Sequence, residues 1–421
     1  MEVTLARHTG VDLAVAAPPS KSLTHRALVV AALADGESEI VRPLEAGDIA
    51  RTRTGLTALG IRVAGDADVL TVQGCGGRLP LDAPVVIDAG DSGTSLRFLT
   101  GLATLGRHPV TLTGSARMQQ RPIGPLGDAV AALGGEVRYA GRPGFPPLTV
   151  RGPVRGGSVA LPGDVSSQFV SALLIAAPCW PDGLALTLET PPVSASYLAL
   201  TTGVMAAFGV EVRREEETFL VEPGRYRPTR YEVEGDWSSA STFFAIGAVC
   251  GGRVRVDHLD PASAQGDRRF LDALAAMGCR VRADATGVVL ESDGVLDGAE
   301  IEMATSPDTV QNLAAVAAFA RGPTTITGTA HLRYKESDRV AAIARVLRGF
   351  GAGVEVGEDR ITVSSGPRRG HLTVDPVHDH RTAMSAAVLG LGSGDVTVQE
   401  AECVAKSFPG FWEALQEGGL V

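Results

Sequence analysis

Lysine and asparagine are almost absent from this sequence. Of its 38 basic residues only Lys21, Lys335 and Lys406 are lysines, and Asn312 is the single asparagine. This bias suggests that arginine has replaced lysine wherever a positive charge alone suffices. The remaining lysines are candidates for places where a compact ammonium is needed and a planar guanidinium does not fit. For any one of them, the alternative is chance retention on the surface.

The sequence also lacks paired cysteines, a long hydrophobic run and an excess of positive charge. Its five cysteines show no CxxC pair and no Cys/His metal spacing, which is typical of buried thiols in a reducing compartment. The longest apolar run, "FVSALLIAAPCW", is too short to span a bilayer, and the N-terminus has no signal-peptide pattern. A net charge of −10 argues against a nucleic acid or a membrane surface as the main partner. We therefore expect a cytoplasmic protein.

A sixfold repeat organises the chain. Six times a polar or small stretch precedes an alanine-rich apolar helix, and two of these starts, "GDVSS" and "GDWSS", are nearly identical. The starts are spaced by 70 to 74 residues and are marked by Ser20, Ser92, Ser166, Ser238, Asp308 and His380. Five times a second helix ends at glycine and is followed by alternating residues typical of a β-hairpin. The repeat predicts an α/β chain of six similar units.

Six such units exceed what one hydrophobic core accommodates, so we expect two domains of three units each. A helix that is apolar on all sides must be buried, which puts one helix of each unit inside a domain. The boundary should lie near residues 232–238, between the third and fourth units. The first strand-like stretch precedes the first repeat helix and could belong to the C-terminal half, with a second crossing near Ala16–Pro19.

The starts of the apolar helices are rich in Ser, Thr, Asp and Gly. Such residues cap the free backbone N–H groups of a first turn, and an uncovered helix N-terminus binds anions. The first start sets Lys21 and Arg26 around Ser22, and the second has Gly93 where a side chain would block a ligand. Taken singly, these starts can be simple caps or ligand sites, and Asp308 has the same two interpretations.

The run "RYKESDRV" gathers charges of both signs at the predicted start of a helix. A solvated first turn is one interpretation, because acids suit the positive end of a helix dipole. Lys335 and Arg339 are four residues apart, and on one helix face they repel by roughly a few tenths of a kcal/mol. A shared anion beside both cations is the other interpretation, and it places Glu336 next to that anion.

Together these motifs resemble the EPSP synthase family of enolpyruvyl transferases. The resemblance covers nearly the whole chain, from "PPSKSLTHRA" to "CVAKSFPGFW", with every motif in order. It implies a two-domain, inside-out α/β (α+β) fold with three βαβαββ repeats around buried parallel helices in each domain. The implied domains are residues 18–234 and residues 1–17 with 235–421, and the implied active site is the interdomain cleft.

The resemblance also implies an activity. The family transfers the enolpyruvyl (1-carboxyvinyl) group of phosphoenolpyruvate to the 5-hydroxyl of shikimate 3-phosphate, through a tetrahedral addition–elimination intermediate, and releases phosphate. This is a step of the shikimate pathway to the aromatic amino acids and the target of glyphosate. The implied partners are these two substrates, without nucleic acid or membrane, and the family suggests a monomer that needs no metal and no cofactor.

Carried over motif by motif, the family's roles fall on cations, carboxylates and small polar residues. Asp308, Glu336 and Lys21 match the catalytic residues. The residues that match the shikimate 3-phosphate site are Lys21, Ser22, Arg26, Ser166, Ser167, Gln168, Ser194, Asp308, His331 and Lys335. Those that match the phosphoenolpyruvate site are Lys21, Gly93, Arg121, Gln168, Arg339, Arg381 and Lys406. These residue types suit two substrates that each carry a carboxylate and a phosphate, and a reaction that moves protons at one oxygen and one carbon.

The sequence departs from the family pattern at three positions. Asp91 stands where Asn is usual, Phe98 where Pro is common, and His331 where a substrate-binding Asn is expected. The scarcity of asparagine accounts for two of these changes. Asp91 brings a carboxylate near the expected phosphoenolpyruvate site, while His331 either donates a hydrogen bond to shikimate phosphate or only packs. The "HDH" at residues 378–380 lacks further ligands at metal-binding spacing.

Three other functions fit parts of the sequence. UDP-N-acetylglucosamine enolpyruvyl transferase, which shares the fold, has Lys-Asn at the first helix and a loop cysteine, whereas this chain has "SKS" and "TGSARMQQRPIG". A catalytically idle binding protein is disfavoured by the presence of both carboxylates and all three lysines. An RNA-end-processing enzyme of related fold needs a basic surface, which the net charge of −10 does not favour.

Overall fold

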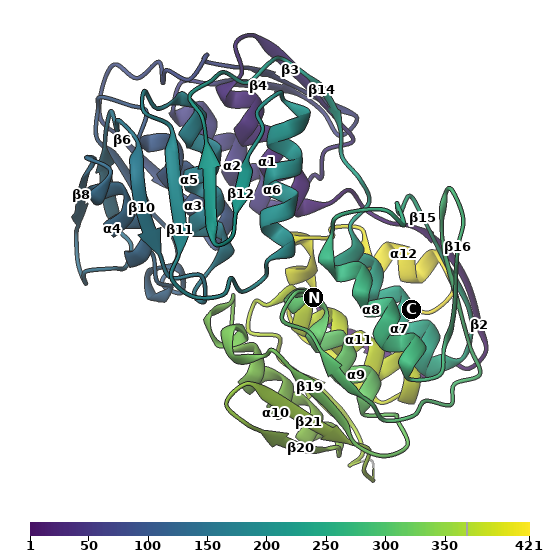
Figure 1. The fold of residues 1–421 in the computed structure, drawn as a ribbon. Coiled ribbons are helices and arrows are strands. Elements are labelled where there is room, and N and C mark those ends of the chain that lie inside the picture. The colour runs from purple at the N-terminus through teal and green to yellow at the C-terminus, as the bar shows by residue number, and fades with distance from the viewer. Residues whose placement is uncertain (368) are drawn as a thin grey trace. The chain divides into compact units, whose positions relative to one another are not determined.

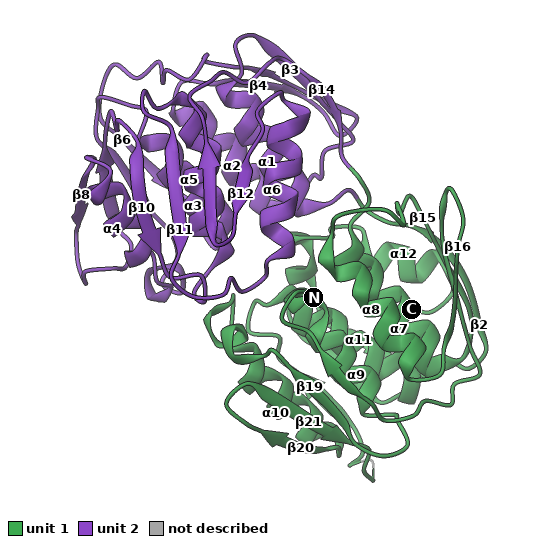
Figure 2. Ribbon diagram, in the orientation of Figure 1, with its two compact units in different colours: residues 1–18, 234–421 green, residues 19–233 purple. Residues whose placement is uncertain are grey.

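The computed structural model of the chain describes residues 1–367 and 369–421. These residues form two compact units (Figure 2): unit 1 consists of Met1–Pro18 and Glu234–Val421, and unit 2 of Pro19–Val233. The chain therefore passes from one unit to the other twice. Each unit has its own cluster of buried apolar side chains.

Unit 2 contains three four-stranded sheets of one common design (Figure 1). In each sheet a parallel pair of strands is extended by an antiparallel hairpin. In spatial order the sheets are β14 (Arg230–Glu232), β3 (Glu37–Val41), β5 (Val69–Gln73) and β4 (Arg62–Gly65); β6 (Val85–Asp88), β7 (Val110–Thr113), β9 (Leu148–Arg151) and β8 (Glu136–Tyr139); and β10 (Gly157–Leu161), β11 (Leu184–Leu188), β13 (Thr218–Val221) and β12 (Arg213–Glu215).

Unit 1 repeats this design in two of its three sheets. They are β2 (Val11–Ala16), β15 (Gly252–Asp257), β17 (Gly287–Ser292) and β16 (Arg280–Ala283); and β18 (Glu300–Glu302), β19 (Thr324–Thr327), β21 (Arg360–Ser364) and β20 (Gly353–Val356). The third sheet has three strands, β1 (Val3–Leu5), β23 (Val396–Val398) and β22 (Leu372–Val374). The N-terminal strands β1 and β2 pair with β23 and β15, so the start of the chain completes two sheets of unit 1.

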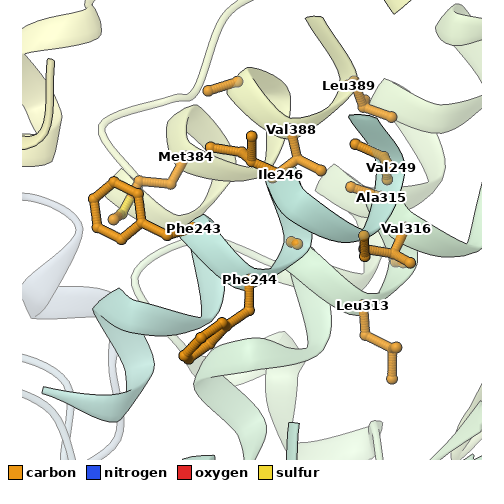
Figure 3. Close-up of a cluster of buried hydrophobic side chains, with 14 of the residues drawn as sticks. Phe243, Phe244, Ile246, Val249, Leu313, Ala315, Val316, Met384, Val388 and Leu389 are labelled. Carbon is orange, nitrogen blue, oxygen red and sulfur yellow. The ribbon is translucent and has the colours of Figure 1, made fainter. Parts of the chain in front are cut away.

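The six apolar helices predicted from the repeat are all present. They are α1 (Lys21–Leu33), α3 (Gly93–Ala103), α5 (Ser167–Ala176), α7 (Trp237–Cys250), α9 (Val310–Ala317) and α11 (His380–Ser393). Their predicted burial is confirmed, since for example all 14 residues of α7 are buried. In unit 1, α7, α9 and α11 pack against one another, with side chains such as Ile246, Ala315 and Val388 between them (Figure 3). Because the residues of strands such as β2 and β3 are alternately buried and exposed, the sheets form the outer layer around these helices.

A second set of helices separates the strands of each repeat. They are α2 (Gly47–Ala58), α4 (Gly124–Ala132), α6 (Ser196–Ala207), α8 (Phe270–Ala276), α10 (Arg339–Phe350) and α12 (Phe411–Glu417). The first five are followed by a glycine with positive φ, namely Gly60, Gly134, Gly209, Gly278 and Gly351. Since L-residues rarely adopt this conformation, these glycines end the helices as predicted, and a hairpin follows each of them.

In the described part of the chain, no helix has both the length and the apolar character needed to cross a bilayer. Among the same residues, no group of His, Cys, Asp and Glu side chains is arranged to hold a metal ion. All five cysteines are free thiols.

The close approach of α3 and α5 in unit 2 generates a stability prediction. A Cβ on Gly101 of α3 would lie 2.4 Å from the backbone oxygen of Ala172 in α5. Alanine gains about 1 kcal/mol over glycine in a helix, but the overlap with rigid backbone costs about 1–3 kcal/mol, so we expect Gly101→Ala to destabilise unit 2 by up to about 2 kcal/mol. Urea unfolding of the full chain, followed by circular dichroism, measures this change.

The matched control is Gly203→Ala in α6 of the same unit. A Cβ on Gly203 meets nothing within 4 Å. Only the helix propensity acts there, so this variant should gain about 0.5–1 kcal/mol. Equal effects of the two substitutions would contradict the proposed packing.

Candidate functional site

The charged part of unit 1 is organised around one buried guanidinium. Arg339, the first residue of α10, has a side chain that is 1% exposed. Its Nη1 lies 2.8 Å from Asp308 Oδ1, its Nη2 lies 3.0 Å from Glu336 Oε2, and its Nε lies 3.0 Å from Asp379 Oδ2. Three carboxylates from separate segments therefore share one cation, which offsets the cost of burying them.

The start of α10 differs from the sequence prediction. Lys335 and Arg339 were predicted on one helix face, and this is wrong because Lys335 follows the 3₁₀ helix η5 (Ala330–Tyr334) and α10 begins only at Arg339. The carboxylate of Asp338 accepts a hydrogen bond from the Ala341 N–H at 3.0 Å, which fixes the helix start. Glu336 thus lies on a bend before the helix, from which it reaches Arg339.

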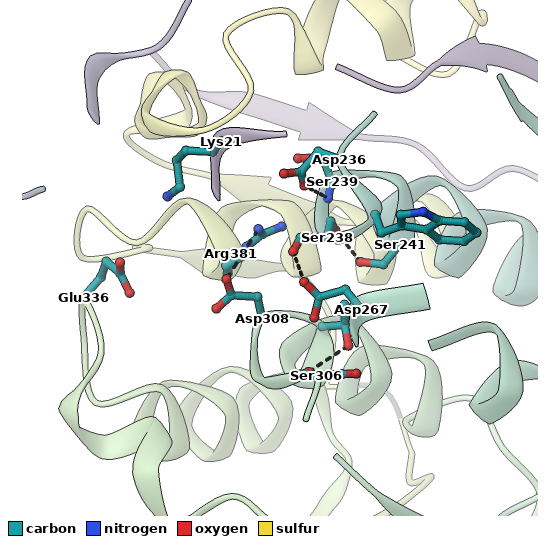
Figure 4. A network of polar contacts seen from close by, with 12 residues as sticks. Lys21, Asp236, Ser238, Ser239, Ser241, Asp267, Ser306, Asp308, Glu336 and Arg381 are labelled. Carbon is teal, nitrogen blue, oxygen red and sulfur yellow. Dashed lines mark hydrogen bonds and ion pairs between the residues drawn. The ribbon is translucent and has the colours of Figure 1, made fainter. Parts of the chain in front are cut away.

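Asp308 lies in the short 3₁₀ helix η4 (Pro307–Thr309), just before α9. Its Oδ2 lies 3.9 Å from Arg381 Nη2, and Figure 4 shows the two side chains facing each other. Burial by itself would raise the pKa of Asp308, but the neighbouring cations, Arg339 first, outweigh it and lower the pKa below its usual value. Asp308 is therefore a carboxylate held between two guanidinium groups.

Arg381 at the start of α11 has donors that the protein leaves open. The residue is 3% exposed, and its Nε and Nη1 have no hydrogen-bond partner within the described residues. Buried donors are normally paired, so these atoms indicate a place for an anion. The backbone N–H of Arg381 donates to Asp379, whose side chain caps α11 and also binds Arg339.

His331 and the two lysines of unit 1 complete this group of predicted residues. Burial, assisted by the charge of Lys335, lowers the pKa of His331 to about 3, so its ring is neutral at pH 7. The Nε2 of His331 is buried and has no partner in the described chain. Lys406 ends the 3₁₀ helix η6 (Ala401–Lys406), which packs against α11.

In unit 2 the start of α1 carries Lys21, Ser22 and Arg26. Lys21 Nζ lies 3.2 Å from Asp48 Oδ2. Arg26 is 2% exposed and donates to Ser22 O, Thr201 Oγ1 and Tyr197 O. Burial lowers the pKa of Arg26 to about 10, which still leaves it charged at pH 7. Three of its five N–H groups are engaged within the protein, so only the other two can reach a ligand.

Two guanidinium groups meet over the start of α3. A Cβ on Gly93 would lie 2.5 Å from Arg97 Nη1 and 2.8 Å from Arg121 Nη1, so any side chain there would displace the two guanidinium groups. Arg97 donates to Gln168 Oε1 at 2.8 Å, whereas the buried Nε of Arg121 has no partner among the residues described. Two cations at a positive helix terminus repel each other unless an anion joins them. This arrangement is a candidate anion site within unit 2.

The serines predicted for phosphate binding frame the neighbouring helix. Ser166 caps α5, since its Oγ accepts a hydrogen bond from the Gln168 N–H, and Ser167 is the first helical residue. Gln168 Nε2 donates to Thr94 Oγ1 at 3.0 Å. Ser194 has a φ of 56°, and its buried Oγ lacks a partner in the described part of the chain. Ser194 therefore combines backbone strain with an open hydroxyl, as functional residues often do.

The structure shows what surrounds Asp91 and Phe98, two of the positions that depart from the family pattern. Asp91 is exposed and accepts a hydrogen bond from Ser115. Phe98 is 1% exposed, and the guanidinium of Arg26 lies 5.3 Å from its ring centre. Phe98 therefore makes a cation–π contact with Arg26 inside unit 2.

Three residues at these sites were missed from the sequence: Asp48, Arg97 and Asp379. Asp379 precedes α11 and Asp48 lies in the first turn of α2, where acidic residues are common without a functional role. Arg97 follows Gly93 by one helical turn, which was the one available signal for it. Their roles come from partners far away in the sequence, which no local pattern reveals.

Comparisons with known proteins agree with one another. A sequence profile of the family described as "EPSP synthase (3-phosphoshikimate 1-carboxyvinyltransferase)" matches residues 7–415. Relatives named 3-phosphoshikimate 1-carboxyvinyltransferase include that of Methanoculleus marisnigri, with 55% identity over 100% of both chains, and that of Yersinia pseudotuberculosis, with 39% identity over 94% of both. A solved structure of EPSP synthase from Acinetobacter baumannii has a TM-score of 0.81 and 27% identity, covering 100% of this chain and 98% of that one.

The cluster around Arg339 predicts a large loss of stability in Arg339→Leu. Removing the cation leaves three carboxylates without it, and breaking such a buried pair costs about 3–5 kcal/mol. Asp308 has a lowered folded pKa, so the stability it contributes exists above the unfolded value of about 3.9 and is lost as the pH falls. The difference between variant and wild type should therefore be larger at pH 7 than at pH 2.5, as measured by urea unfolding.

Arg345→Leu on the same helix is the control. Arg345 is exposed and donates only to the backbone oxygen of Asp375. Its loss should cost less than about 1 kcal/mol and should not depend on pH in this range. A similar cost for both variants would mean that Arg339 does not organise the cluster.

Proposed function

Because the chain belongs to the EPSP synthase (3-phosphoshikimate 1-carboxyvinyltransferase) family, we propose that it transfers the enolpyruvyl group of phosphoenolpyruvate to the 5-hydroxyl of shikimate 3-phosphate and releases phosphate. The observation that carries this proposal is the buried Arg381, which has open Nε and Nη1 donors and lies beside Asp308. A cation with open donors next to a carboxylate serves both an anionic substrate and a proton transfer.

The reaction needs two proton transfers in each of its two steps. In the addition, the 5-hydroxyl oxygen bonds to C2 of phosphoenolpyruvate, Asp308 takes the hydroxyl proton, and Glu336 gives a proton to the methylene carbon. In the elimination, the methyl group returns a proton to Glu336 while the bond from C2 to the phosphate oxygen breaks. The departing phosphate, assisted by Lys21, takes up the proton that Asp308 removed from the hydroxyl, so both carboxyl groups return to their starting states.

The pairing of Asp308 sets a condition on this mechanism. With two guanidinium groups beside it, Asp308 has a pKa too low for an effective base. We infer that the carboxylate and phosphate groups of the substrates offer Arg339 and Arg381 alternative partners, which raises the pKa of Asp308. The hydroxyl proton is then removed only when the anionic substrates are bound.

The remaining assignments follow the chemistry of the two substrates. Open polar atoms on Arg121, Ser194 and His331 support roles in binding. The proposed ligands of shikimate 3-phosphate are Lys21, Ser22, Arg26, Ser166, Ser167, Gln168, Ser194, Asp308, His331 and Lys335. The proposed ligands of phosphoenolpyruvate are Lys21, Gly93, Arg121, Gln168, Arg339, Arg381 and Lys406. We also propose that the protein acts as a monomer in the cytoplasm, where its five thiols stay reduced.

Phosphate release tests the proposed reaction directly. The purified chain should release phosphate when shikimate 3-phosphate and phosphoenolpyruvate are both present, because the bond to phosphate breaks only in the tetrahedral intermediate. Neither substrate alone should give phosphate above the buffer background. Release from phosphoenolpyruvate alone would indicate a hydrolase, and no release with both substrates would indicate a binding protein.

Replacement of the two proposed acid/base residues gives a second prediction. Asp308→Asn and Glu336→Gln keep the shape of each side chain but remove its proton chemistry, so kcat should fall by about 10²–10⁴-fold in each. Binding of shikimate 3-phosphate, measured by calorimetry, should change by less than about tenfold, because removal of a carboxylate beside cations does not weaken an anion site.

The control for this pair is Glu355→Gln on β20, an exposed acid of the same unit. It should leave kcat and substrate binding at wild-type values. Near-normal turnover of Asp308→Asn would refute the role of that residue as the base.

A further inference from the structure

A second buried acid, Asp267, lies close to Asp308 and has no part in the reaction proposed above. It belongs to the 3₁₀ helix η3 (Gly266–Arg269) of unit 1 and is 5% exposed. The hydroxyl of Ser238, the second residue of α7, donates a hydrogen bond to Asp267 Oδ2 (Figure 4). A carboxyl group is rarely buried to this extent without a specific reason.

Asp267 is linked to the Asp308 segment by a short connection. Ser306, which is fully buried, donates its hydroxyl to the backbone oxygen of Gly266 at 2.6 Å. One hydrogen bond thus joins the residue before Asp267 to a residue two positions before Asp308 (Figure 4). This hydrogen bond connects η3, which carries Asp267, to the segment that carries the proposed base.

The charges that face Asp267 are mainly negative. Asp236 at the start of α7 and Asp308 in η4 act against its ionisation, whereas Arg381 of α11 favours it. Burial first, and the charge of Asp308 second, raise the pKa of Asp267 to about 7, while the hydrogen bond from Ser238 acts in the opposite direction.

The two arginines of η3 itself are exposed and are engaged elsewhere. Arg268 donates to the backbone oxygen of Pro261, and Arg269 donates to the hydroxyl of Thr305. Arg381 acts on both Asp267 and Asp308.

We propose that Asp267 is a positioning residue that carries a proton in the active protein, and that in this neutral form it leaves Arg381 to Asp308 and to the anionic substrate. This inference rests on the role proposed for Asp308. When Asp267 loses its proton, the new negative charge attracts Arg381 and repels the Asp308 carboxylate, and this interaction is strong because the groups are buried. The open donors of Arg381 are then drawn away from the anionic substrate, so binding of phosphoenolpyruvate becomes weaker.

The pH dependence of Asp267→Asn tests this proposal. Asn has the shape of a protonated Asp but cannot ionise. The ratio of kcat/KM for phosphoenolpyruvate between this variant and the wild type should rise about tenfold from pH 6 to pH 8, because a group with a pKa of about 7 goes from about nine-tenths protonated to about one-tenth. Titration of the substrate phosphates cancels in this ratio.

Two further variants separate this effect from a loss of structure. Ser238→Ala removes a hydrogen bond that lowers the pKa of Asp267, so the decline of kcat/KM relative to Asp267→Asn should begin at a higher pH. Asp272→Asn on α8 removes an exposed acid close by in the sequence and should keep the wild-type profile. A merely structural role for Asp267 would change the activity of its variant by the same factor at every pH.

Thermal unfolding gives a readout that does not depend on catalysis. The folded pKa of Asp267 is raised above the unfolded value of about 3.9, so the wild type loses stability relative to Asp267→Asn as the pH rises from 4 to 7. The melting temperature of the variant minus that of the wild type should therefore increase by more than about 2 °C over this range.

The outcomes distinguish this inference from the proposed function. A constant activity ratio between pH 6 and 8, or a constant difference in melting temperature, would overturn the role of Asp267 even where Asp308→Asn abolishes turnover. Loss of the pH effect in Asp267→Asn together with its shift in Ser238→Ala would support that role. If Asp308→Asn keeps its turnover, the proposed base is wrong, while the melting temperatures still report whether Asp267 holds a proton.

Discussion

The burial of Arg339 is the constraint on which the charged region of unit 1 depends. One guanidinium, 1% exposed, binds carboxylates from η4, from the bend before α10 and from the cap of α11. Without this cation, Asp308 and Glu336 would repel each other and neither would be held at a fixed place. The proposed acid and base are thus positioned by a shared partner, which keeps two like charges close while their roles remain separate.

In unit 2, by contrast, positive charges are gathered at the start of one helix. At the start of α3, Arg97 and Arg121 approach Gly93 from the same side, and their repulsion adds to the positive end of the helix dipole. Arg97 is partly satisfied by Gln168 and by the backbone oxygen of Pro122. Carboxylates compensate cations in unit 1, whereas neutral oxygens compensate them here. An anionic group that joined the two arginines would supply the charge that these oxygens do not.

Much of the fold was predictable because it repeats. The apolar helices are confirmed in all six repeats, and the fold class agrees with the Acinetobacter baumannii structure at a TM-score of 0.81. The start of α10 was mispredicted because Asp338 caps the helix three residues later than the charge pattern suggested. Asp379 and Asp267 were missed because their importance comes from Arg339 and Ser238, which are distant in sequence. The roles assigned to the site residues remain predictions.

The numbers of acids and cations in unit 1 give Asp267, which takes no part in the proposed reaction, an influence on the binding of anions. In the described part of unit 1, Asp236, Asp267, Asp308, Glu336 and Asp379 act on one another or on the cations Lys335, Arg339 and Arg381. If all five acids were ionised, the region would carry more negative than positive charge and would repel a phosphate. His331 does not correct this, because burial keeps its ring neutral. The proposed proton on Asp267 removes one negative charge that acts on Arg381 and Asp308, without giving up the acids that the reaction uses. The excess of negative charge in the region then falls from two to one, and to none when Glu336 holds the proton that it gives in the proposed addition, although the whole chain has a net charge of −10.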